Sequence, residues 1–174
     1  VVIRELETLE EVDRSGTLLV RTRFRVHAPA GGVLTEVDWG LAAHEVAWLA
    51  DYHVLDGFGR ELRYRAEEAA GGGKKVLVEL DRPLLAGEDL ELSVVFRQPG
   101  LVKQEGAEWV YRHRGDYPDP RLVTRTLFLP PGATIVSVTP AATHQQTARD
   151  GSTTVIWRRY FAAAEVHPFE VRYR

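Results

Sequence analysis

The sequence predicts an all-β protein, a mainly antiparallel two-sheet β-sandwich of about 11–12 strands with little or no helix. Three observations support this prediction. Apolar and polar residues alternate with period two along most of the chain, which is typical of strands with one buried face. Short segments rich in Gly, Pro and Asp separate the alternating stretches. No stretch shows the convincing helical periodicity that crossover helices would need, so the strands are expected to pair antiparallel.

The clearest strand covers residues 18–27, where apolar residues and Thr occupy the even positions and Arg or His the odd positions from 21 onward. Residues 2–12 are expected to be its hairpin partner, joined by a three-residue loop with Gly16 in the left-handed conformation. That register places Glu7 opposite Arg23. Opposite charges across a strand pair stabilise by about 0.2–1 kcal/mol. We therefore interpret the basic stripe as a neutralised sheet face, with an anion-binding surface as the alternative.

Five further strands are expected in the first half, at residues 33–39, 46–55, 61–66, 74–80 and 90–96. The second of these places Val46, Trp48, Ala50, Tyr52 and Val54 on one side. Asp56 begins a turn because glycines flank the bend that follows it. Glycines 71–73 are expected to form a hairpin tip, since they lack the spacing and the Ser or Thr of a phosphate-binding loop.

The second half continues the pattern, with strands expected at residues 108–114, 122–129, 134–138, 153–157 and 167–173, and a weaker strand signal at 142–148. Prolines interrupt this region because they cannot donate a backbone hydrogen bond to a neighbouring strand. Asp150-Gly151 is a strong signal for a two-residue hairpin. Residues 98–106 are expected to form a loop.

Length and composition indicate one folded domain over residues 1–174, with 98–106 as the place for a sub-boundary. The absence of cysteine excludes a disulfide scaffold and thiolate chemistry. The net charge of −3 argues against nucleic acid as a partner, and no apolar run is long enough to span a membrane. A chain that starts at Val1 and contains no methionine is expected to be a processed protein or an excised domain.

No catalytic or cofactor motif is found. His44-Glu45 begins like the zinc peptidase motif, but position 48 is Trp where the second His is required. No nucleophile elbow surrounds any serine. Neighbouring acidic residues such as Glu10 and Glu11 are expected to form solvated faces. We therefore predict no catalytic residue, no cofactor and no metal.

One stretch combines aromatic, basic and acidic residues in a pattern suited to a sugar or a peptide. These candidate contact residues are Trp109, Tyr111, Arg112, His113, Tyr117, Asp119 and Arg121. Strand alternation favours another interpretation, in which Trp109 and Tyr111 fill the core while Arg112 and Arg114 face water.

A series of turns and strands resembles the N-terminal β-domain of M1-type zinc aminopeptidases. The similarity covers roughly residues 35–140. The turn Pro83-Leu84-Leu85-Ala86-Gly87-Glu88 precedes a strand, and a later strand ends in Pro130-Pro131-Gly132. The peptidase domain and its zinc helix have no counterpart, so the resemblance implies an accessory sandwich that packs against another domain or partner and transfers no catalytic residue. Val136–Pro140, the hairpin at 150–151 and the closing strand also resemble modules of bacterial envelope proteins.

Three main hypotheses follow for function, beside a minority alternative in which the chain is an enzyme whose site is assembled from distant strands. The first is a non-catalytic β-sandwich interaction module, partnered by another protein or a flanking domain. The second is a carbohydrate- or peptide-binding module that uses the aromatic and arginine surface. The third is an M1-peptidase-like N-terminal domain that supports a separate catalytic domain. The resemblance to envelope modules favours an extracytoplasmic location.

Overall fold

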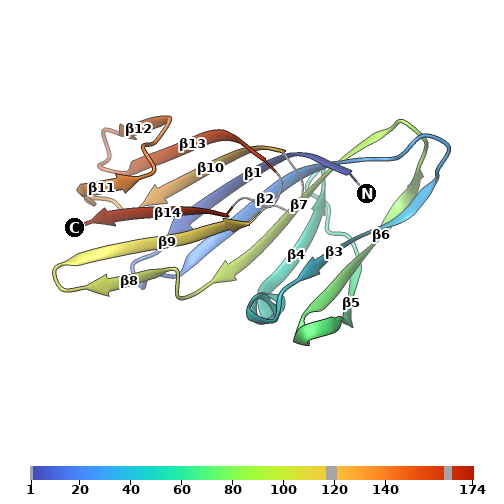
Figure 1. The fold of residues 1–174 in the computed structure, drawn as a ribbon, viewed down its shortest axis with the longest axis horizontal. Helices are drawn as coiled ribbons and strands as arrows, with labels where there is room; N and C mark the ends of the chain where they lie inside the picture. Colours follow the sequence, from blue (N-terminus) through green and yellow to red (C-terminus); the bar gives the residue numbers. More distant parts are fainter. Residues whose placement is uncertain (1, 117–120, 163–165) are drawn as a thin grey trace. The chain divides into compact units, whose positions relative to one another are not determined.

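A computed structural model of the chain describes residues 2–116, 121–162 and 166–174. Strands dominate these residues and pair mostly antiparallel, so the predicted all-β class is confirmed (Figure 1). The chain divides into two compact units. The first unit contains Val1–Arg4 and Thr22–Phe96, and the second contains Glu5–Arg21 and Arg97–Arg174.

The first unit contains the strands β2-β7-β4, which are neighbours in one sheet, and a three-stranded sheet ordered β3-β6-β5. Their strands are β2 (Leu18–His27), β3 (Leu34–Leu41), β4 (Tyr52–Asp56), β5 (Tyr64–Glu68), β6 (Lys74–Leu84) and β7 (Asp89–Gln98). Aromatic side chains join the two sheets. The ring of Phe24 meets Trp39 edge-on at 5.3 Å, and the Trp39 indole N–H donates to the Tyr52 hydroxyl at 2.9 Å. The two sheets therefore share one aromatic core.

The second unit contains the strands β12-β13-β10-β1-β2, which are neighbours in one sheet, and a four-stranded sheet ordered β11-β14-β9-β8. Its remaining strands are β1 (Val2–Val12), β8 (Val102–Glu105), β9 (Glu108–Asp116), β10 (Arg121–Leu129), β11 (Ile135–Thr139), β12 (His144–Thr147), β13 (Thr153–Phe161) and β14 (Val166–Tyr173). Phe169 from β14 packs between Trp157 and Phe161 of β13, at ring distances of 5.2 and 6.2 Å. This contact closes the core between the two sheets.

The predicted alternation of β2 is confirmed, because its apolar even positions are buried and its arginines are exposed. The loop before it has the expected form. Asp13 N–H donates to the Thr17 carbonyl at 2.9 Å, and Gly16 has φ +81°. The Asp13 carboxylate accepts the N–H groups of Ser15 and Thr17, which holds the turn in shape.

The strand predicted at 46–55 is wrong over its first part. Residues Ala43–Asp51 form a 3₁₀ helix, η1, and only β4 from Tyr52 onward is a strand. Glu45 explains the difference: its carboxylate accepts the Ala42 N–H at 2.7 Å, and its own N–H donates to the Ala42 carbonyl at 2.9 Å. Trp48 then reaches the core from the helix, stacked on Phe96 at 4.6 Å.

Three smaller features also differ from expectation. The predicted loop at 98–106 contains the short strand β8, which pairs with β9. β1 pairs in parallel with β10, an arrangement that short-range pattern cannot show because the partners are far apart in the chain. The Asp150-Gly151 hairpin has three loop residues, because the closing hydrogen bond joins Ala148 and Ser152.

Candidate functional site

Among the described residues, those predicted to contact a ligand do not converge on one surface. Alternation along β9 buries Tyr111 completely, leaves Trp109 and His113 half-buried, and exposes Arg112 on the opposite side. The Arg112 guanidinium is bound by Glu105 and, at 2.8 Å, by Glu170, which raises the pKa of Arg112. Of the other predicted contacts, Arg121 is buried on β10, whereas Tyr117 and Asp119 lie outside the described residues.

Two of these residues instead belong to a buried polar cluster, formed by Glu10, Tyr111, His113 and Arg125. The Tyr111 hydroxyl donates to Glu10 Oε2 at 2.6 Å, and Arg125 Nη1 forms an ion pair with Glu10 Oε1. Arg125 Nη2 lies 2.9 Å from His113 Nε2. Since a guanidinium only donates, the imidazole accepts through Nε2 and carries its proton on Nδ1.

Burial sets the charge states of this cluster. Burial and the nearby Glu10 carboxylate raise the pKa of Tyr111 well above its usual value, so the hydroxyl stays protonated. Burial and the Arg125 charge hold the pKa of His113 well below 6.5, so the ring stays neutral. Glu10, Tyr111 and Arg125 are at most 4% exposed. A substrate has no access to these groups, so the cluster is structural.

The expectation that Glu10 lies with Glu11 on a solvated face is wrong for Glu10, which is 1% exposed. A signal for this was present in the sequence. Glu10 shares its parity with Thr8 and Val12, and both of these are buried on β1. The period-two pattern therefore pointed Glu10 inward, while its partner Arg125 came from a distant strand.

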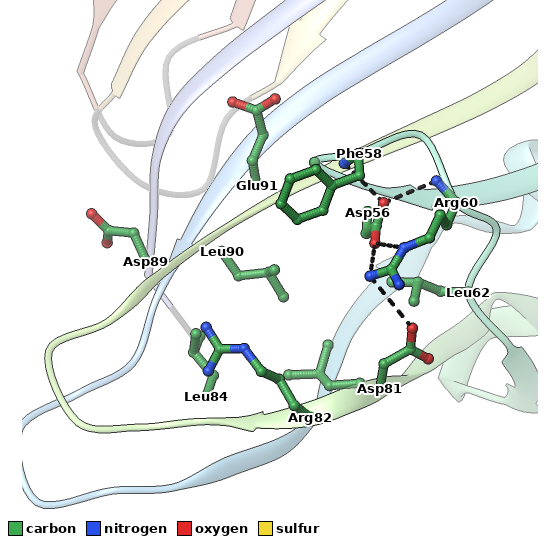
Figure 2. Close-up of a pocket in the computed structure, with 12 residues that line it drawn as sticks. Asp56, Phe58, Arg60, Leu62, Asp81, Arg82, Leu84, Asp89, Leu90 and Glu91 are labelled. Atoms are coloured by element: carbon green, nitrogen blue, oxygen red, sulfur yellow. Dashed lines mark hydrogen bonds and ion pairs between the residues drawn. The ribbon is translucent and has the colours of Figure 1, made fainter.

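The first unit contains an open pocket of about 410 Å³ beside the turn after β4 (Figure 2). Leucines form its apolar part, and charged side chains surround them. The lining includes Phe58, Arg60, Asp81, Arg82, Leu90 and Glu91. Four carboxylates and two guanidinium groups line the pocket in total.

Asp56 makes the turn beside this pocket rigid. One of its carboxylate oxygens accepts the N–H groups of Phe58 and Arg60, each at 2.9 Å. The other oxygen binds the Arg60 guanidinium at 2.8 and 2.6 Å. The turn thereby holds the Phe58 ring 90% exposed, with the Arg60 guanidinium 5.7 Å from the ring centre.

A second cleft, of about 280 Å³, lies in the second unit. Trp109, Tyr173, Pro130 and Pro131 supply its flat apolar surfaces, and Arg14 adds a guanidinium. Trp109 is the predicted contact residue that lines this cleft; Arg112 points from the other side of β9.

Within residues 2–116, 121–162 and 166–174, no three His, Asp or Glu side chains are grouped closely enough to hold a metal ion. His44 and Glu45, which begin like a zinc motif, lie in the 3₁₀ helix η1. No helix among the described residues is long and apolar enough to cross a bilayer.

No family model and no curated protein sequence matches the chain. Solved structures do match. The M1 zinc metallopeptidase from Deinococcus radiodurans is 18% identical with a TM-score of 0.63, over 97% of this chain and 41% of that protein. Native yeast LTA4 hydrolase is 7% identical with a TM-score of 0.65, over 98% of this chain and 28% of that protein.

These matches confirm the predicted resemblance to the N-terminal β-domain of M1 metallopeptidases at the level of the fold. The chain spans less than half the length of either protein. The Deinococcus protein is named a zinc metallopeptidase. The described residues of this chain contain no group of three His, Asp or Glu side chains that could hold a metal ion.

Proposed function

We propose that this chain acts as a non-catalytic accessory β-module that supports a separate catalytic domain or partner protein. The observation that carries the proposal is the extent of the structural match: nearly the whole chain aligns with only 41% of an M1 zinc metallopeptidase. The Glu10 cluster supports it, since Glu10, Tyr111 and Arg125 are buried and closed to substrate.

The test is hydrolysis of aminoacyl p-nitroanilides by the purified chain, with and without added zinc. We expect no rate above that of buffer, from protein whose circular dichroism shows a folded β-structure. Hydrolysis that one substitution, such as His53→Gln, abolishes would overturn the proposal. His53 is suited to this role because it is exposed and bound by Glu61 at 2.8 Å, which raises its pKa.

The cleft beside Trp109 favours a second candidate, a module for a peptide or carbohydrate. Flat aromatic and proline surfaces next to a guanidinium are suited to stacking against such ligands. Arrays of peptides and glycans should then give a saturable signal that Arg14→Ala weakens. Arg112→Ala is the matched control, because Arg112 lies outside the cleft. The absence of any saturable signal would remove this candidate.

A further inference from the structure

The turn Asp56–Arg60 presents an exposed aromatic side chain in a fixed position. Phe58 is 90% exposed, although its backbone is held by the Asp56 carboxylate on both sides of it. A residue whose backbone is already held in a turn loses less conformational entropy when it binds than a residue on a mobile loop. Large aromatic anchors of this kind carry much of the binding energy at protein interfaces.

The pocket beside Phe58 can receive a side chain from a partner. Its floor includes Leu62 and Leu84, which are 5% and 2% exposed, and Leu90 lies between the floor and the Phe58 ring (Figure 2). The volume of about 410 Å³ lies within the range of small-ligand sites. An aliphatic side chain placed there would contact leucine on one side and the aromatic ring on the other.

Charge around the pocket identifies the kind of partner. The two guanidiniums in its lining already have carboxylate partners: Arg60 binds Asp56 at 2.6 Å, and Arg82 binds Glu88 at 3.0 Å. Asp81 and Glu91 lie on opposite sides of the pocket and form longer ion pairs, Asp81 with Arg60 at 3.8 Å and Glu91 with Arg23 at 3.7 Å. Carboxylates therefore outnumber guanidiniums at the rim, which favours a cationic partner.

We infer that this pocket binds a peptide segment of a partner protein in which an aliphatic residue is flanked by Lys or Arg. The aliphatic side chain fills the space between Phe58 and Leu90, and the basic groups pair with Asp81 and Glu91. The inference rests on the proposed accessory function for the existence of a partner. It also adds to that function, because it names the surface and the chemistry of the contact.

The experiment is a titration of the ¹⁵N-labelled chain, followed by amide chemical shifts. The probes are two N-acetylated, C-amidated tripeptides, Lys-Leu-Lys and Glu-Leu-Glu. We expect Lys-Leu-Lys to move the amides of Phe58, Arg60 and Leu90 in a saturable way, and Glu-Leu-Glu to leave them in place. Equal shifts with both peptides, or none with either, would overturn the inference.

Two variants separate the apolar and charged contributions. Phe58→Ser should weaken Lys-Leu-Lys by about tenfold, because it removes most of the apolar contact. Phe128→Ser is the matched control, since Phe128 is exposed but belongs to the second unit and does not line the pocket. The double variant Asp81→Asn, Glu91→Gln should remove the preference for the basic peptide. An unchanged affinity in Phe58→Ser would contradict the inference.

The two proposals fail separately. A failed titration removes this docking surface and leaves the accessory function in place, because the probes replace the natural partner. Genuine hydrolase activity removes the accessory function and leaves the surface in place.

Discussion

Four polar side chains in the second unit, Glu10, Tyr111, His113 and Arg125, form a hydrogen-bonded cluster inside an otherwise apolar core. Each of the four side chains forms a hydrogen bond or ion pair with another member of the cluster. The buried charges of Glu10 and Arg125 are therefore compensated only while all four are present. The Arg125 guanidinium also lies 5.5 Å from the centre of the Phe169 ring, which adds a cation–π contact. At the scale of the residue, this cluster is where single substitutions should cost most.

Glu10→Gln should lower the free energy of unfolding by about 3–5 kcal/mol, because it removes the carboxylate that balances the buried Arg125. Urea unfolding would measure the loss. Glu11→Gln is the matched control, since Glu11 is the exposed neighbour on the same strand. In the double variant Glu10→Gln, Arg125→Met, part of the loss should return. Additive effects in that cycle would contradict the pairing.

The lowered pKa of His113 predicts how the free energy of unfolding depends on pH. Its pKa in the folded chain lies well below 6.5, whereas the unfolded chain has the ordinary value. As the pH falls through about 6.5, the unfolded chain therefore binds a proton that the folded chain does not, and stability is lost progressively down to the folded-state pKa.

The variant His113→Gln should show a smaller drop in melting temperature between about pH 7.5 and pH 5.5 than the natural chain. Glutamine can still accept a hydrogen bond from Arg125 but does not titrate. The exposed residue His144 offers the control His144→Gln, which should keep the natural slope. An unchanged slope in His113→Gln would show that other groups cause the acid sensitivity.

At the scale of the element, one form of turn recurs. In the loops that begin at Asp13, Asp56 and Ala148, the backbone N–H of the first residue donates to the carbonyl of the fifth residue. The fourth residue of each loop is a glycine. Gly16, Gly59 and Gly151 have φ of about +80°, a conformation that glycine adopts without strain. The positions of these turns could be predicted from the sequence because the constraint is local, although the turn at 150–151 was expected to have two loop residues and has three. The same local reasoning missed η1, where the Glu45 carboxylate accepts a hydrogen bond from the Ala42 N–H.

Gly73, just before β6, is needed for a different reason. A Cβ built there would lie 2.5 Å from the Leu41 carbonyl oxygen, at the end of the β3–β6 pairing. Gly73→Ala should therefore destabilise the chain by about 1–3 kcal/mol, measured by thermal unfolding. Gly40→Ala is the control, because a Cβ at Gly40 meets nothing within 4 Å. Equal melting temperatures for Gly73→Ala and Gly40→Ala would contradict a close contact between a Cβ at position 73 and the Leu41 carbonyl oxygen.

At the scale of the whole molecule, charge is balanced locally. The chain has 22 Lys and Arg against 25 Asp and Glu, and many of them pair between strands of the same sheet, as Arg65 of β5 does with Glu36 of β3, and Lys75 of β6 with Asp38 of β3. Each unit contains its own aromatic core. The chain aligns with 41% of the Deinococcus M1 zinc metallopeptidase and with 28% of yeast LTA4 hydrolase.

The sequence by itself determined the all-β class, the alternating faces of strands such as β2 and the glycine turns, because these depend on residues close together in the chain. Only the tertiary structure revealed the buried cluster of Glu10 and Arg125 and the pocket beside Phe58. Their parts come from separate strands: β1, β9 and β10 for the cluster, and β6, β7 and the turn after β4 for the pocket. Which strands become neighbours is decided by packing of the whole fold, so a local pattern cannot bring these side chains together.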